Sequence, residues 1–410
     1  MRRRTFLRSA AAAAAGAAGL ARAAAAPLPA AGVTLGDEVF LRESWRELRG
    51  RTIGIITNQT GVTSRLQTLV DAVRARPEIR VRAIYAPEHG FRGDRPAGSY
   101  VPSYTDEATG LPVYSLYGPT RHPSAAMLEG VDVLVYDIQD VGSRAYTFIS
   151  TMAYAMQSAK EAGKEFWVLD RPNPVGSMVE GPVLEPAFAS FIGLYPIAMR
   201  HGMTVGELAK LFNEHFGIGA QLRVVPMRGY TREMIWPQTG LQWVQSSPNI
   251  PDWQTTFPYL CTGLIDNLGI NNGVGTAKPF FYAGMVGLDG DALARALNAR
   301  NLPGIFFRAA SWSPFAGFWL GKELHGVELV IFDPSRFEAL RTAVEIAVAV
   351  REVAPKVIDI KKPADLDRDW GTDSFRKELL AGNSADDILA GWRASTTAFK
   401  ALREKYLLYP

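Results

Sequence analysis

Residues 131–136 read VDVLVY and run directly into the polar stretch DIQDVGSR at residues 137–144. A short, almost continuous apolar stretch predicts a strand buried on both faces, as in a parallel sheet. Three further stretches of this kind are residues 51–57 (RTIGIIT), 81–85 (VRAIY) and 166–169 (FWVL). Together the four stretches predict a parallel sheet.

Helical patterns with recognisable end signals lie between and after these strands. The expected helices are residues 64–76 after Thr63 or Ser64, residues 146–162 before Gly163, and residues 205–215 after the capping box of Thr204 and Glu207. Strands that alternate with helices predict an α/β fold whose sheet is covered by helices on both faces. No G-x-G-x-x-G sequence follows the first strand, so a dinucleotide site lacks its signature.

The second half of the chain has a different pattern. Residues 223–258 are rich in Pro, Trp, Gly and Gln and show little periodicity, and we place a domain boundary at their end, between residues 33–256 and 257–410. The elements expected beyond it are a helix near residues 291–299, strands at 304–308 and 327–332, a helix over 335–353 and a last helix after Ser384.

Residues 1–26 read as an export signal rather than as part of the fold. A basic start (MRRRTFLR) precedes an Ala-rich apolar stretch that ends before Pro27, which is the pattern of a cleaved signal peptide. The pair Arg3-Arg4 resembles a twin-arginine signal, so the expected partner is the twin-arginine export machinery and the expected location is periplasmic or secreted. The alternative is a low-complexity tail with chance arginines. No later apolar run is long enough to predict a membrane anchor.

Composition narrows the function classes. The formal net charge is +3, and removing the five arginines of residues 1–26 makes it −2, which does not favour nucleic-acid binding. Cys261 is the only cysteine, so no disulfide within the chain and no cysteine-based metal site is expected. The sequence has no H-E-x-x-H and no G-x-S-x-G, so zinc and serine hydrolase sites lack their signatures and we expect no cofactor.

Each of the four predicted strands ends in a polar cluster. In open parallel sheets ligands bind outside the carboxyl ends of the strands, because the connecting loops converge there. One cluster alone would be weak, since Asp and Asn are ordinary turn residues. The candidate site residues are Asn58, Glu88, His89, Arg92, Asp137, Asp140, Arg144, Asp170 and Asn173, together with Glu180 and His201 in later Gly-framed loops.

Glu88 is the first candidate for a catalytic residue. It lies in the stiff loop A-P-E-H-G, where a partly desolvated glutamate can donate a proton to a leaving-group oxygen. The alternative is a loop glutamate paired with Arg92. His89 either orients Glu88, binds substrate, or is a packed loop histidine.

Asp140 is the expected second carboxylate, as a base or an electrostatic partner. Arg144 either binds an anionic substrate group or forms an ion pair with Asp140. Asp137 has the alternative of bonding loop amides, and His201 that of capping the following helix. For Asp170 and Asn173 the alternative is a turn-forming role, and a divalent cation on the carboxylates is a further possibility.

Six ordered motifs carry a family resemblance. They are residues 55–62 (IITNQTGV), 86–93 (APEHGFRG), 109–118 (TGLPVYSLYG), 135–144 (VYDIQDVGSR), 169–176 (LDRPNPVG) and 200–208 (RHGMTVGEL). The chain resembles the exo-β-N-acetylmuramidase NamZ family of glycoside hydrolases, formerly the DUF1343 family, from about residue 50 to its end.

The resemblance implies a Rossmann-like N-terminal domain, a smaller α+β C-terminal domain and an active site in the cleft between them. It implies the release of terminal N-acetylmuramic acid from peptidoglycan fragments, with Glu88 as the leading catalytic candidate. The lactyl carboxylate of muramic acid would give Arg92, Arg144 or Arg200 a group to bind.

One loop departs from the family pattern. Many members read roughly EGTNLSEGRGT where residues 266–276 read DNLGINNGVGT, so Asp266 and Asn272 replace glutamates and an arginine is lost. A different sugar or aglycone preference would follow if this loop lines the pocket. Two other functions stay open at this point, a non-catalytic muropeptide-binding protein and a metal-dependent hydrolase of another cell-wall bond.

Overall fold

The computed structural model describes residues 32–410 with the exception of 318, 356, 357 and 359. The export signal expected at residues 1–26 lies outside the described residues. None of the described helices is both long enough and apolar enough to cross a membrane.

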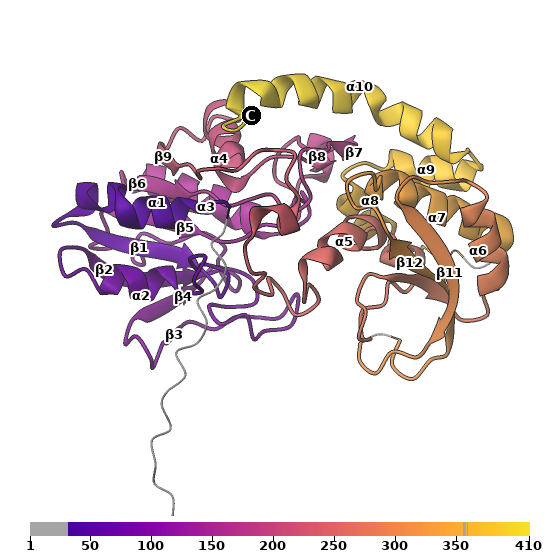
Figure 1. Ribbon diagram of the computed structural model, residues 1–410, viewed down its shortest axis with the longest axis horizontal. Coiled ribbons are helices and arrows are strands. Elements are labelled where there is room, and N and C mark those ends of the chain that lie inside the picture. Colours follow the sequence, from indigo (N-terminus) through magenta and orange to yellow (C-terminus); the bar gives the residue numbers. More distant parts are fainter. Residues whose placement is uncertain (1–31, 318, 356–357, 359) are drawn as a thin grey trace, which may run out of the picture. The chain divides into compact units, whose positions relative to one another are not determined.

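The N-terminal half contains a mostly parallel sheet (Figure 1), as the four apolar stretches predict. Its strands, in the spatial order β3-β4-β2-β1-β5-β6-β9, pair in parallel except for the edge strand β3. The bounds are β1 (Thr52–Thr57), β2 (Arg80–Ala86), β3 (Tyr104–Thr105), β4 (Pro112–Ser115), β5 (Val133–Asp137), β6 (Glu165–Leu169) and β9 (Gln221–Val225).

Helices cover both faces of this sheet. Alternate residues of one strand face opposite sides, so Ile55 packs into a core cluster with α1 (Gly36–Arg42) and α2 (Leu69–Arg74). Ile56 packs on the other side with α3 (Phe148–Glu161) and α4 (Val205–Glu214). The two-sided covering predicted from the continuous apolar strands is therefore confirmed.

The helix expected over residues 64–76 is wrong in its first turn. Val62 and Thr68 form an isolated β-bridge, and Leu66 has a left-handed backbone with φ of 61°. The segment is therefore a turn, and α2 begins only after Thr68, whose Oγ1 accepts the Asp71 N–H at 3.1 Å. In contrast, Gly163 follows α3 with φ of 65°, as expected for a glycine beyond a helix end.

The C-terminal half contains an antiparallel sheet and several helices (Figure 1). Its strands, in the order β10-β12-β11, are β10 (Tyr282–Met285), β11 (Ile305–Trp312) and β12 (Leu324–Ile331). The helices are α5 (Thr256–Thr262), α6 (Gly290–Asn298), α7 (Ala339–Val353), α8 (Pro363–Trp370), α9 (Ser374–Ala381) and α10 (Ala385–Arg403). This smaller α+β half agrees with the expected fold class, while the domain division at residue 256 stays a prediction.

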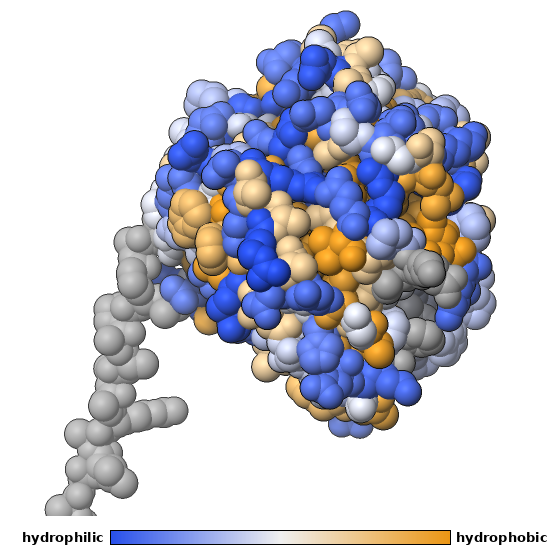
Figure 2. All heavy atoms as spheres, turned by 90° about the vertical axis from the view of Figure 1, so that its right-hand side faces the viewer, coloured by the Kyte–Doolittle hydropathy of each residue, from blue (hydrophilic) through white to orange (hydrophobic). Residues whose placement is uncertain are grey.

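One face of the C-terminal sheet is buried and the other is open. Phe307 and Val327 lie in the same core cluster as α6 and α7, whereas Phe306 and Val330 point outward and are exposed. Figure 2 shows the molecule from the right-hand side of Figure 1, where hydrophobic surface lies in patches between hydrophilic residues.

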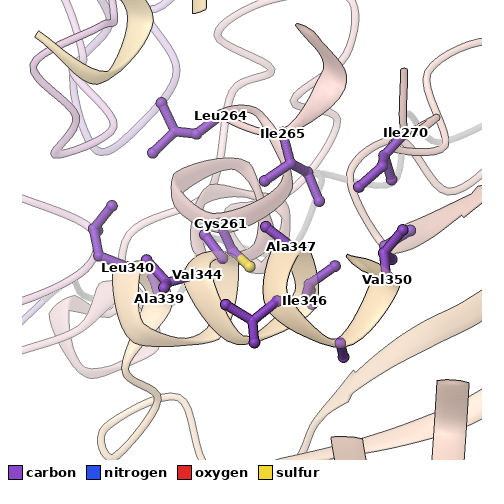
Figure 3. Packing of buried hydrophobic residues seen from close by; sticks show 14 of the residues in the cluster. Cys261, Leu264, Ile265, Ile270, Ala339, Leu340, Val344, Ile346, Ala347 and Val350 are labelled. Carbon is purple, nitrogen blue, oxygen red and sulfur yellow. The ribbon is translucent and has the colours of Figure 1, made fainter. Parts of the chain in front are cut away.

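The buried cysteine belongs to this second core. Figure 3 shows Cys261 of α5 lying over α7, close to Val344 and Ala347. Its thiol is free and fully buried, so it acts as a small apolar side chain in the packing. Two short strands, β7 (Glu180–Val183) and β8 (Ala198–Arg200), pair with each other, and β7 contacts α7 and α10.

Candidate active site

A topological switch point at the centre of the N-terminal sheet follows from its strand order. From β1 the chain proceeds to β2 and β4 on one side of the sheet, whereas β5, β6 and β9 lie on the other side. The loops after β1 and β5 therefore leave in opposite directions, which creates a topological switch point where α/β proteins bind ligands. Residues 58–61 and 138–142 form these two loops.

Unsatisfied buried polar atoms gather around this switch point. In the part of the chain that the structure describes, thirteen buried side-chain nitrogen and oxygen atoms lack a hydrogen-bond partner, and six belong to this region. They are Asn58 Nδ2, Gln59 Oε1, Asp137 Oδ2, Gln139 Oε1, Asp140 Oδ1 and His201 Nε2. Because buried polar atoms normally have partners, this cluster is what water or a polar ligand would complete.

Glu88 follows β2, the strand next to β1, and its side chain is fixed by hydrogen-bond donors. The residue is 8% exposed; Oε1 accepts the Gly98 N–H at 2.8 Å and Oε2 accepts the Thr147 hydroxyl at 2.6 Å. Burial, together with the charge of Glu88 and a hydrogen bond to it, raises the pKa of Tyr117 to about 12. The carboxyl group therefore has a defined direction.

The alternative that pairs Glu88 with Arg92 is contradicted. The Arg92 guanidinium binds Asp106 instead, with Nη2 2.7 Å from Oδ1. Arg92 is half-exposed in this ion pair, and its expected contact with substrate stays a prediction.

Asp140 lies near the same aromatic residues as Glu88. Burial raises the pKa of Tyr146, and the charges of Asp140 and Glu88 add to the increase. Burial also raises the pKa of Tyr259 of α5, where Tyr146, Glu88 and Asp140 contribute further. Both carboxylates therefore lie within electrostatic range of one pair of buried tyrosines, and their catalytic roles stay a prediction.

The carboxylate of Asp140 is held on one side only. Its Oδ2 accepts the Gly142 N–H at 2.8 Å and lies 3.5 Å from His201 Nε2, whereas Oδ1 has no partner among the described residues. Asp140 is 4% exposed. One oxygen thus remains for water or for a ligand.

Arg144 neither pairs with Asp140 nor is free to bind a substrate anion. Its guanidinium is 1% exposed and donates to the carbonyl oxygens of Pro182, Ile197 and Asp369. Burial lowers the pKa of Arg144 to about 9. Its role is structural, because its donors connect three distant segments, and both sequence-based alternatives are corrected.

Asp137 is also structural rather than substrate-binding. Its Oδ1 lies 2.6 Å from Arg171 Nε, and Nη2 of the same arginine lies 3.1 Å from Asp37 Oδ2. All three side chains are almost fully buried. The triad joins β5, the loop after β6 and α1.

Asp170 anchors the start of α4. Its Oδ1 accepts N–H groups of Arg171 and Gly206, and its Oδ2 accepts the hydroxyls of Thr204 at 2.8 Å and Tyr409 at 2.6 Å. The four donors explain why this residue is buried, so the expected contact with substrate does not fit. Burial raises the pKa of Asp170 from its ordinary value of 3.8 to about 7.

This shift predicts a pH dependence of stability. Because the folded-state pKa of Asp170 lies above its unfolded value, its contribution is fully present below about pH 4 and is lost as pH rises through about 7. We expect Asp170→Asn to remove this dependence, at most on the order of 4 kcal/mol. The measurement is urea denaturation of both proteins between pH 4 and 8. Parallel pH profiles would contradict the assignment.

Three further candidates have internal partners. Glu180 accepts hydrogen bonds from Arg200 at 2.7 Å and from the Ala339 N–H, so Arg200 is also bound within the protein. Asn173 forms hydrogen bonds with the backbone of Met203 and Val175. Glu180 and Asn173 therefore hold segments together rather than facing a ligand.

His89 and Asn58 stay closer to the expected site. His89 Nδ1 donates to the Arg95 carbonyl at 2.8 Å, and its ring packs edge-on against Phe148, which matches the alternative of a packed loop histidine. Asn58 Oδ1 accepts from Thr60, which leaves Nδ2 as one of the unsatisfied donors. Contact of either residue with substrate stays a prediction.

The loop that departs from the family pattern carries Asp266, whose carboxyl group interacts with that of Asp369 in α8. Burial raises the pKa of Asp266 to about 6, and burial and Asp266 raise that of Asp369 to about 7. Asn267 Nδ2 donates to Asp369 Oδ2 at 2.6 Å, and the Asp369 charge also reaches Tyr259. The sequence does not indicate Asp369 or Tyr259 as site residues, because the local sequence around each does not reveal which distant residues lie next to it.

The described residues contain no group of three or more His, Cys, Asp or Glu side chains that could hold a metal ion. Asp137, which a cation on the carboxylates would need, is bound by Arg171.

Comparison with known families decides the family. The model of the exo-β-N-acetylmuramidase NamZ N-terminal domain matches residues 53–254, and that of the C-terminal domain matches residues 257–409. The chain belongs to the NamZ family. The resemblance carried by the six motifs is thereby confirmed.

Relatives of known identity or structure support this membership. The peptidoglycan β-N-acetylmuramidase NamZ of Bacillus subtilis (strain 168) is 44% identical over 378 residues, which cover 92% of this chain and 91% of the relative. Two solved structures of DUF1343 family proteins from Bacteroides fragilis NCTC 9343 share the fold. One has a TM-score of 0.87 at 37% identity and covers 93% of this chain and 100% of its own. The other has a TM-score of 0.75 at 29% identity and covers 92% and 99%.

Proposed function

We propose that this NamZ family member is an exo-acting glycoside hydrolase that releases terminal β-linked N-acetylmuramic acid from peptidoglycan fragments. Family membership and the peptidoglycan β-N-acetylmuramidase activity of the Bacillus subtilis relative support the reaction and the substrate. The observation that carries the site is the pair of buried carboxylates, Glu88 and Asp140. Thr147, which follows Tyr146, donates to Glu88. Tyr146 packs on Tyr259, and the charges of both carboxylates raise the pKa of these two tyrosines.

The two carboxylates have different environments that suit two roles. Glycoside hydrolysis breaks the bond between the anomeric carbon and the leaving oxygen; water supplies the hydroxyl to the carbon and a proton to the departing sugar. We assign proton donation to Glu88, since the Thr147 hydroxyl can turn to accept a hydrogen bond when Glu88 is protonated. Asp140, with Oδ1 free, is the base or electrostatic partner.

The proposed location is outside the cytoplasm, where peptidoglycan lies. The basic start, the apolar stretch and the Arg3-Arg4 pair of residues 1–26 support export through the twin-arginine machinery.

Turnover of a chromogenic β-N-acetylmuramide tests the function. We expect release of the chromophore, and release of N-acetylmuramic acid from a disaccharide that has this sugar at its non-reducing end. The disaccharide with N-acetylglucosamine at that end serves as the control and should remain intact. Binding without release would instead identify a non-catalytic muropeptide binder, and loss of activity with a chelator would identify a metal-dependent hydrolase.

A further inference from the structure

His201 lies in the loop between β8 and α4, and its ring is completely buried. Its Nδ1 accepts the Met203 N–H at 3.2 Å. In a neutral imidazole that accepts at Nδ1, the proton is on Nε2. This Nε2 lies 3.5 Å from Asp140 Oδ2 and has no hydrogen-bond partner among the described residues.

The backbone around His201 is fixed from the far end of the chain. Arg403 of α10 donates to the carbonyl oxygens of His201, at 3.1 Å, and Gly202, at 2.9 Å. Gly202 has φ of 60°, and a Cβ there would lie 2.2 Å from the Ser177 carbonyl oxygen, so this close approach requires glycine. The loop therefore has little freedom to turn the ring away from Asp140.

The alternative roles of His201 do not fit these contacts. Thr204 and Glu207 cap α4 through a reciprocal capping box, so the helix does not need the histidine as a cap. Nε2, which is the nitrogen left to contact substrate, faces Asp140 and is buried.

We infer that His201 is a positioning residue whose Nε2–H holds Oδ2 of Asp140, so that the unpartnered Oδ1 faces the water or sugar at the switch point. This inference rests on the proposed function, because it gives Asp140 its orientation in that reaction. The distance of 3.5 Å is long for a hydrogen bond, and such contacts in enzymes often shorten when substrate binds.

Two substitutions separate this role from a purely structural one. The side-chain amide of His201→Gln can reach the position of Nε2 and donate to Asp140, but it gives up the contact with Met203. The shorter side-chain amide of His201→Asn keeps an acceptor for the Met203 N–H but cannot reach Asp140.

We expect kcat of His201→Gln to stay within about tenfold of wild type and kcat of His201→Asn to fall at least about a hundredfold, with KM little changed in both. His215→Asn, at an exposed position after α4, is the matched control and should keep the wild-type kcat. A kcat of His201→Asn equal to or above that of His201→Gln would overturn the inference, because a structural role alone predicts that order.

A second measurement begins with the wild-type protein, in which the position of the proton on His201 does not depend on the folding of a variant. In ¹⁵N-histidine-labelled wild-type protein, His201 should show a protonated Nε2 and an unprotonated Nδ1, and the Nε2 resonance should shift in Asp140→Asn. A proton on Nδ1, or no response to Asp140→Asn, would overturn the inference even if the wild-type enzyme is active. If the wild type releases no N-acetylmuramic acid, the proposed function is wrong. The spectrum still tests the contact between His201 and Asp140, because it does not require activity.

Discussion

The Glu88→Gln variant is expected to release N-acetylmuramic acid at least about a hundredfold more slowly than the wild type, the usual scale for a general acid. Gln keeps the size of the side chain and an oxygen for the Gly98 N–H, but it has no acidic proton to give to the leaving oxygen. The kcat/KM on the disaccharide substrate is the measurement, with thermal unfolding as the test that the variant is folded.

Glu107→Gln is the matched control for this change. Glu107 belongs to the same loop-rich region but is exposed, so its substitution should leave the rate unchanged. Wild-type rates in Glu88→Gln would move the proton donor to another residue.

Arg171→Met is expected to destabilise the protein by about 3–5 kcal/mol, because it leaves two buried carboxylates without their cation. Burial raises the pKa of both Asp37 and Asp137, and Arg171 is the charge that opposes this effect. Met replaces the methylenes of the arginine, so the loss is chiefly electrostatic. The free energy of unfolding from urea denaturation at pH 7 is the measurement.

The control for Arg171→Met is a salt bridge at the surface. Arg223 pairs with Glu47, and both side chains are substantially exposed, so Arg223→Met should cost no more than about 1 kcal/mol. Equal losses in the two variants would show that the buried triad contributes no more than an exposed pair.

The central strands could be predicted from the sequence because both of their faces are buried. β1, β2, β5 and β6 occupy the middle of the sheet, and their apolar residues are almost continuous. The peripheral strands β4 and β9 were missed, since β9 contains Gln221 and Arg223 and its residues are mostly partly exposed. The sequence predicts the start of α2 too early, because the turn before this helix depends on the bridge between Val62 and Thr68, which no local sequence signal indicates.

The sequence predicts a site at the ends of the strands but not how each side chain is oriented. Polar residues follow every predicted strand, and the loops after β2 and β5, which carry Glu88 and Asp140, leave the same carboxyl edge of the sheet. Whether a given side chain faces the switch point depends on partners far away in the chain. Arg144 is bound by carbonyl groups at residues 182, 197 and 369, and no local pattern reveals such contacts.

The leaving-group dependence of Glu88→Gln tests proton donation most directly. The dinitrophenolate of a dinitrophenyl β-N-acetylmuramide leaves without a proton when the glycosidic bond breaks, whereas a sugar leaving group needs one. We predict that the variant hydrolyses the dinitrophenyl substrate at nearly the wild-type rate of bond cleavage and loses its activity on the disaccharide. An equal loss on both substrates would contradict the assignment of Glu88 as the acid.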